Sequence, residues 1–189
     1  MTLLTTSRLR LEPFTEGHVA GLNAMNSDPE VMRYLSAGRP ETLDETRAAV
    51  ERVMKRWEEV GYSWWSLIER ATEELVGAGA IQNLRREATL EPDLACPLEI
   101  GWRLRRDRWG QGLAAEAGRA MGDFAFKELD ARELLAVCDP ANIASANVMR
   151  RLGMQEVGVQ RWYGKELLTY WIHADWHVEI VLGQSHCAS

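Results

Sequence analysis

Apolar positions along this chain follow two different spacings, one typical of strands and one typical of helices. Alternation with a period of two predicts about seven strands, over residues 8–12, 62–69, 75–84, 98–104, 133–138, 154–161 and 167–173. Spacings of three and four predict about four helices, which start near Thr15, Thr42, Leu113 and Asn142. We therefore expect an α/β (α+β) fold in which a mixed sheet is flanked by helices.

Local signals refine two of these elements. Thr42 followed by Glu45 forms a capping box at the start of the second helix, and Gly61 is placed to end that helix. Trp64 and Trp65 are neighbours in a strand, so their side chains must point to opposite faces of the sheet. One of the two is expected in the core, and the other is free to line a cleft.

Residues 99–126 are the most informative part of the sequence. They read as a strand, a turn with three arginines, and a glycine pair, Gly110 and Gly112, at the entrance to a helix. Helix N-termini present unpaired N–H groups and partial positive charge, and glycine lets a ligand approach the backbone closely. This corner is therefore predicted to bind an anion, most often a phosphate or pyrophosphate.

Two kinds of phosphate ligand fit such a glycine corner. Gly110, Gly112 and Ala115 satisfy the G-x-G-x-x-A pattern of dinucleotide sites, and Asp139 ends the next strand. However, residues 105–109 separate the strand from the first glycine, and the interval to Asp139 exceeds the usual ~20 residues. A Walker-type site is excluded, because no Lys followed by Ser or Thr comes after the glycines. The dinucleotide interpretation remains the weaker alternative.

Composition narrows the class of protein. The 189 residues predict a single domain over residues 1–180 and a C-terminal tail over 181–189. The formal net charge of −6 disfavours nucleic acid as a partner. Three cysteines without CxxC spacing and four histidines without ligand spacing predict neither a disulfide framework nor a metal site. Because no apolar run reaches membrane length, we expect a soluble, cytoplasmic protein.

Four segments in order along the chain resemble one enzyme family. Residues 109–114 are similar to the acetyl-coenzyme A loop of the GNAT acetyltransferases, Gln/Arg-x-x-Gly-x-Gly/Ala: Gly112 and Ala114 match, and Trp109 replaces Gln or Arg. That tryptophan is typical of the branch resembling the ribosomal-protein acetyltransferases RimJ and RimL. Residues 6–14 resemble this branch's first strand, 27–35 the end of its first helix, and 139–154 its downstream motif.

The resemblance implies a fold and a cofactor, acetyl-CoA. The GNAT fold has a mixed, mostly antiparallel twisted sheet whose splayed strand pair holds the acyl-CoA. The pyrophosphate would bind the loop amides and the pantetheine arm the backbone of Trp102 and Leu104, while Asn142, also a good helix N-cap, would touch the arm. The implied cofactor-binding residues are Trp102, Leu104, Trp109, Gly110, Gln111, Gly112, Leu113, Ala114 and Asn142.

The resemblance also suggests catalytic candidates. Attack on the thioester needs a neutral amine, and Glu99 is the best-placed proton acceptor on its strand, although a pairing with Arg103 or another arginine would make it structural. Ser145 matches a serine proposed to protonate the departing thiolate in RimL-like enzymes, but a serine there can also simply start the helix. Met149 stands where many relatives have a tyrosine acid.

The acceptor site is the least readable part of the sequence. By resemblance it is lined by aromatics, for which the candidates are Tyr34, Trp64, Trp65 and Tyr163. The implied reaction moves acetyl from acetyl-CoA to a primary amine, either a protein N-terminus or a small molecule, by direct attack in a ternary complex. A catalytically silent acyl-CoA-binding module is the alternative. We expect a monomer or homodimer with no nucleic acid and no membrane partner.

Overall fold

The structure is a computed structural model that describes residues 2–35, 38–90 and 93–174. The chain forms two compact units. The first contains residues up to 82 together with 101–121, and the second contains residues 83–100 together with those from 122 onward. The predicted tail over residues 181–189 lies outside the described residues.

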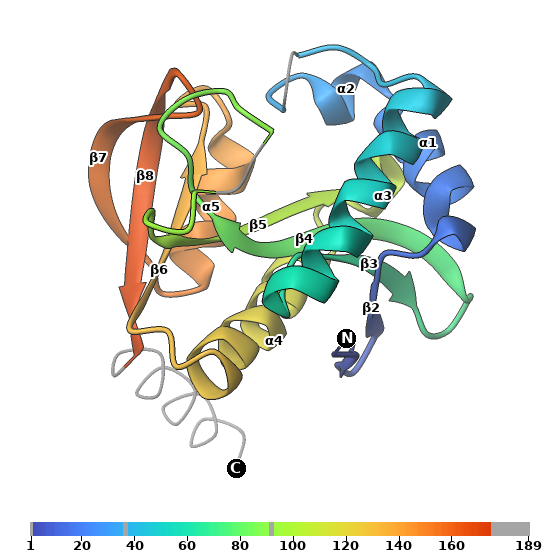
Figure 1. Cartoon of the computed structure of the whole chain (residues 1–189), viewed down its shortest axis with the longest axis horizontal. Helices are drawn as coiled ribbons and strands as arrows, with labels where there is room; N and C mark the ends of the chain where they lie inside the picture. Colours follow the sequence, from blue (N-terminus) through green and yellow to red (C-terminus); the bar gives the residue numbers. More distant parts are fainter. Residues whose placement is uncertain (1, 36–37, 91–92, 175–189) are drawn as a thin grey trace. The chain divides into compact units, whose positions relative to one another are not determined.

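The first unit is built on an antiparallel run of strands. Strands β1 (Leu4–Thr5), β2 (Leu9–Pro13), β3 (Trp64–Glu69) and β4 (Glu74–Asn83) pair in chain order (Figure 1). The second half of β5 (Leu98–Leu104) follows β4 in the sheet. Its end is tied down by the Arg105 N–H, which donates to the Val76 carbonyl at 2.9 Å.

Helices pack on these strands. They are η1 (Glu16–His18), α1 (Val19–Asn26), α2 (Pro29–Met32), α3 (Leu43–Val60), η2 (Arg106–Arg108) and the first part of α4 (Leu113–Glu128). Figure 1 shows α1 beside α3, and Asn23 of α1 donates to the Thr46 hydroxyl of α3 at 3.1 Å. Gly79 brings β4 so close to α4 that an added Cβ would lie 2.7 Å from the Met121 sulfur. This close approach fixes the helix that begins at the glycine corner.

The second unit has strands with mixed pairing. Its strands are the first half of β5, then β6 (Glu133–Cys138), β8 (Lys165–His173) and β7 (Gln155–Trp162), in that spatial order. β5 and β6 are parallel and pair at Glu99 and Leu135, whereas β8 is antiparallel to both neighbours. The rest of α4 and helix α5 (Ile143–Arg151) belong to this unit.

The sequence patterns located nearly all of these elements. The capping box is confirmed, since the Thr42 N–H donates to Glu45 Oε2 at 2.8 Å and the Glu45 N–H to the Thr42 hydroxyl at 3.2 Å. Gly61 ends α3 at φ +78°, as expected. Two elements were missed, β1 with two residues and α2 with four, because neither is long enough to show a period. None of the described helices is long and apolar enough to cross a bilayer.

Candidate functional site

The glycine corner has the geometry of an anion-binding loop. Gly110 and Gly112 adopt φ of +74° and +79°, the left-handed region that glycine enters without steric cost. Helix α4 starts directly after them, and its first turn closes when the Glu116 N–H donates to the Gly112 carbonyl at 3.0 Å. The N–H groups of the residues between them have no partner within the turn, which is the usual state of a helix start. They are therefore available to an anion.

Arg8 and Glu116 hold this corner in shape. The Glu116 carboxylate accepts hydrogen bonds from the Thr6 hydroxyl at 2.5 Å, the Arg8 N–H at 2.8 Å and the Arg8 Nε at 2.6 Å. Arg8 Nη1 in turn donates to the Gln111 carbonyl at 2.8 Å, between the two glycines. A strand-end arginine and a first-turn carboxylate thus fix the loop conformation from outside the loop.

The pKa of Glu116 reflects this clamp. Partial burial of the carboxyl acts to raise its pKa, but the hydrogen bonds from Thr6, Arg8 and Ser7 outweigh burial and hold the pKa below its usual value. The carboxylate is therefore ionised throughout the neutral pH range and keeps its ion pair and hydrogen bonds with Arg8.

We expect Glu116→Gln to lower the free energy of unfolding by about 1–2 kcal/mol at pH 7. A carboxyl whose pKa is depressed on folding stabilises the protein fully above its unfolded-state pKa, and that contribution disappears as pH falls through the folded-state pKa. The difference between wild type and variant should therefore shrink below about pH 4. Urea unfolding of wild type and Glu116→Gln, once at pH 7 and once below about pH 4, measures this difference in stability. Glu51→Gln, on the exposed face of α3, is the control. A difference that is zero at pH 7, or unchanged in acid, would refute the clamp.

The basic turn before the glycines is mostly paired internally. Arg105 bonds Asp107 at 2.9 Å, and Arg108 lies 2.9 Å from Glu74 and 3.5 Å from Glu69. Arg106 is exposed, and the described part of the chain gives it no ion-pair partner. Arg105 and Arg108 therefore act mainly in holding the turn, and Arg106 is the arginine best able to meet a ligand anion.

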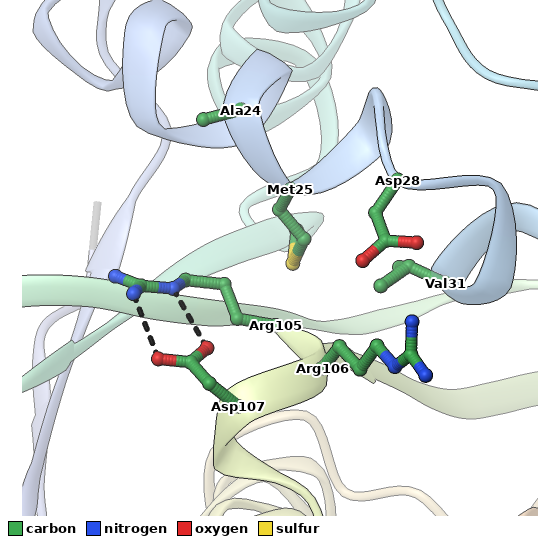
Figure 2. Close-up of a pocket in the computed structure, with 7 residues that line it drawn as sticks. All are labelled: Ala24, Met25, Asp28, Val31, Arg105, Arg106 and Asp107. Atoms are coloured by element: carbon green, nitrogen blue, oxygen red, sulfur yellow. Dashed lines mark hydrogen bonds and ion pairs between the residues drawn. The ribbon is translucent and has the colours of Figure 1, made fainter.

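A hollow of about 490 Å³ adjoins this turn, at the corner of α1 and α2 (Figure 2). The Asp28 carboxylate there already caps α2 by accepting the Glu30 N–H at 2.8 Å. Arg105 is also paired, with Asp107. The hollow therefore offers a ligand mainly space and apolar contact rather than reactive side chains. Its lining is Ala24, Met25, Asp28, Val31, Arg105, Arg106 and Asp107.

Trp109, in the first position of the loop motif, ties the loop to the end of β5. Its indole Nε1 donates to the Leu104 carbonyl at 2.9 Å, while 47% of the side chain remains exposed. One carbonyl of the stretch expected to meet the pantetheine arm is thus already used within the protein. Trp102 is half-buried, and Leu113 and Ala114 are buried at the start of α4.

In the second unit, Glu99 is joined to Tyr163. Glu99 is 8% exposed on β5, and the Tyr163 hydroxyl donates a short hydrogen bond to its carboxylate. Tyr163 sits in the β7–β8 turn at φ +53°, where its N–H donates to the Arg85 carbonyl at 2.7 Å and the Arg85 guanidinium lies 5.1 Å from its ring centroid. Burial, with the charge of Glu99, raises the pKa of the Tyr163 phenol, so it stays a neutral donor. The sequence suggested an arginine partner for Glu99 and missed Tyr163.

Asn142 and Ser145 meet at the start of α5. The Asn142 side-chain oxygen accepts the Ser145 N–H at 3.1 Å, so Asn142 is the N-cap of this helix. Both residues are half-buried, whereas Met149 is 1% exposed. The cap leaves the Asn142 amide nitrogen and the Ser145 hydroxyl as the groups of this corner that can meet a ligand.

The four aromatic candidates for the acceptor site fall into two groups by burial. Trp65 is fully buried, edge-on to Trp57 with ring centroids 4.9 Å apart, so its assignment to the acceptor wall was wrong and it is a core residue. Trp64, Tyr34 and Tyr163 are half-buried. Alternation predicted that one tryptophan would be core, and the structure identifies which one.

Together these features define the class of protein: an α/β fold with an anion-binding loop at the start of a helix. Residues 8–155 match the acetyltransferase (GNAT) domain family, which covers most of the chain. The chain therefore belongs to the GNAT family and is an acyltransferase that moves acetyl to an acceptor. The expected GNAT fold is confirmed, with eight strands and five α-helices in the described residues.

Known proteins agree with this assignment. An uncharacterised protein, YkkB of Bacillus subtilis, is 30% identical over 172 residues, which is 89% of this chain and 94% of that protein. FsC-acetyl coenzyme A-N(2)-transacetylase of Aspergillus fumigatus is 32% identical over 155 residues, 82% of this chain and 65% of that protein. The solved structure of RimL, a ribosomal alpha-N-protein acetyltransferase in complex with coenzyme A, shares the fold at TM-score 0.74 and 20% identity, covering 91% of this chain and 98% of that one.

Proposed function

We propose that this protein transfers acetyl from acetyl-CoA to a primary amine. The observation that carries the proposal is the clamped glycine corner, where Gly110 and Gly112 hold left-handed φ and the first N–H groups of α4 point away from the helix. Acetyl-CoA supplies the activated acyl group when it is bound. The chain's own residues then bind its phosphates, hold its arm and receive the proton that the amine gives up.

Donor binding falls to the loop and to two flanking elements. The N–H groups of Gly112, Leu113 and Ala114 would bind the pyrophosphate, helped by the helix dipole; Gly110 leaves open space for its approach, and Gln111 is exposed beside it. Trp109 fixes the loop to β5. Backbone groups of Trp102 and Leu104 would align the arm, and the Asn142 amide would bond it.

Proton transfer falls to Glu99. A carboxylate that is 8% exposed, in a fixed orientation set by Tyr163, is a suitable acceptor for the proton that the ammonium must lose before the neutral amine attacks, directly or through water. Ser145 would serve as donor to the departing thiolate. With Met149 buried in place of a tyrosine, little else at this helix can donate a proton, but a thiol with a pKa around 8.5 leaves without strong acid assistance.

For the acceptor we propose a small-molecule amine or a protein N-terminus; the candidate aromatic contacts are Tyr34 and Trp64 in the first unit and, in the second, Tyr163. The tryptophan at the loop start supports placement in the RimJ/RimL-like branch. The stretch that enters the last strand, from Gly164 to Leu168, lacks the His-Asp pair common in that branch, so the amine need not be a ribosomal protein.

Free thiol release tests this proposal. We expect the protein with acetyl-CoA to release thiol when supplied with at least one of a panel of polyamines, amino acids, aminoglycosides and N-terminal peptides, and to yield the acetylated amine by mass. Thermal stabilisation by acetyl-CoA without thiol release from any amine would instead support a silent acyl-CoA-binding module. Stabilisation by NAD and none by acetyl-CoA would overturn the assignment of the glycine corner.

A further inference from the structure

Arg103 is a half-buried cation that lies over an aromatic ring. Its guanidinium carbon lies 4.9 Å from the ring centroid of Trp64, close enough for a cation–π contact. Its Nε is fully enclosed and makes no hydrogen bond. A polar atom enclosed in the interior is normally hydrogen-bonded, because leaving it unpaired there is costly. Among the described residues, however, Arg103 has no ion pair and no hydrogen-bond acceptor.

The nearest acidic group does not fill this role. Glu41 acts on Arg103 only through its charge, and its carboxylate is held elsewhere, by Asn26 Nδ2 at 2.8 Å and the Thr46 hydroxyl at 3.2 Å. Burial lowers the pKa of Arg103, partly offset by Glu41, but a guanidinium remains charged in proteins. The fold therefore keeps a positive charge without a direct counter-ion, although an apolar side chain of similar volume would be less costly here.

The ring beneath Arg103 is rigidly held. Trp64 Nε1 donates to the side-chain oxygen of Gln82 on β4 at 3.1 Å, and the Trp64 carbonyl accepts the indole N–H of Trp57 from α3 at 3.0 Å. Phe14 lies 6.4 Å away, centroid to centroid. A cation on so fixed a platform is preorganised, and binding to it costs little reorganisation.

We propose that Arg103, on its Trp64 platform, binds a carboxylate carried by the acceptor, so that the preferred acceptor is an amine that also bears a carboxylate. A carboxylate would supply the missing counter-charge, and it would bind the terminal Nη groups of the planar guanidinium, since Nε is enclosed. A single guanidinium with Glu41 nearby suits a monoanion better than a phosphate. The inference rests on the proposed acetyl transfer and specifies its substrate class.

The carboxylate has two sources with the same chemistry: a free amino acid, or an acidic residue that follows a protein N-terminus. Matched pairs separate charge from size. β-Alanine, propylamine and diaminopropane differ mainly in the group distal to the amine, which is anionic, neutral or cationic. Alanyl-glutamate and alanyl-glutamine, both as C-terminal amides so that only the first bears a carboxylate, make the same comparison for a peptide N-terminus. Whichever pair shows the larger preference for its anionic member identifies the source.

We expect wild type to favour the anionic member of at least one pair in kcat/KM. Arg103→Gln should lower kcat/KM for that member at least about tenfold and leave the neutral member within about twofold, since only the anionic member makes charge-assisted hydrogen bonds with Arg103. Arg103→Lys, which keeps the charge without the planar fork, should be intermediate and guards against a folding defect. Arg52→Gln, at an exposed position of α3, is the matched control and should change neither.

A binding measurement decides the inference independently of turnover. N-acetyl-β-alanine and N-acetyl-alanyl-glutamate are titrated calorimetrically into wild type and Arg103→Gln, with coenzyme A present. Binding to wild type that is lost in Arg103→Gln supports the carboxylate site, even if no amine releases thiol and the proposed acetyl transfer fails. No binding of either compound to wild type, an equal affinity for both proteins, or an equal loss of activity toward charged and neutral amines would overturn it.

Discussion

Replacing Gly112 with alanine should weaken acetyl-CoA binding by about tenfold or more. At φ +79° an L-residue is strained by roughly 1–2 kcal/mol, and a tenfold change in Kd corresponds to 1.4 kcal/mol. Among the residues that the structure describes, only Arg8 Nη2, at 3.6 Å, lies within 4 Å of the added Cβ, so the unliganded loop can relax toward negative φ. This relaxation turns the N–H groups at the start of α4 away from their binding direction. Acetyl-CoA must then restore the strained backbone when it binds, which lowers its affinity. Isothermal titration with acetyl-CoA measures the effect.

Gly61→Ala is the matched control for this prediction. Gly61 has nearly the same backbone conformation, φ +78°, and equally open surroundings, but it ends α3 and is not part of the loop. We expect Gly61→Ala to lower Tm and to leave the Kd for acetyl-CoA unchanged. If Gly112→Ala binds acetyl-CoA as tightly as Gly61→Ala does, the glycine corner does not hold the pyrophosphate.

Glu99→Gln should lower kcat/KM about a hundredfold or more at neutral pH, which is the usual contribution of a positioned base. The amide keeps the size of the side chain and can still accept the Tyr163 hydrogen bond, but it cannot take a proton. Acetyl-CoA affinity should stay unchanged. Because a larger fraction of an alkylamine is already neutral near its pKa of about 10, the defect should shrink as pH rises toward that value. A pH profile of both proteins measures this.

A second carboxylate in the same unit provides the control. Glu156 also accepts a tyrosine hydroxyl, that of Tyr170 at 2.7 Å, but it is exposed near the start of β7. Glu156→Gln should therefore retain wild-type kcat/KM at every pH. If Glu99→Gln is as active as Glu156→Gln at pH 7, the Glu99–Tyr163 pair is structural, and the amine loses its proton to water.

Local patterns predicted the elements well, because local physics sets them. The capping box at Thr42 and the stop at Gly61 depend on residues within one turn, and both are observed. The glycine corner was likewise found from its own residues. The two-residue strand β1 and the four-residue helix α2 were missed, since elements this short carry no periodicity and depend on tertiary contacts.

The side-chain contacts that hold the site residues in place could not be predicted from the sequence. Arg8 and Glu116 are 108 residues apart, and Tyr163 and Glu99 are 64 apart, so no spacing rule joins either pair. Alternation placed Trp64 and Trp65 on opposite faces but could not say which face is core. The same limit applied to Arg103, which the sequence offered as a partner for Glu99 and which the structure instead places on Trp64. Side-chain pairing over long sequence separation is a property of the fold.

A crystal structure of the protein with acetyl-CoA tests the central claim most directly. We predict that the pyrophosphate oxygens lie about 3 Å from the N–H groups of Gly112, Leu113 and Ala114, with Gly110 and Gly112 still at positive φ and the Arg8–Glu116 clamp intact. We also predict the thioester beside the backbone of Trp102 and Leu104. A pyrophosphate bound away from α4, or a loop whose glycines abandon the left-handed conformation on binding, would contradict the account.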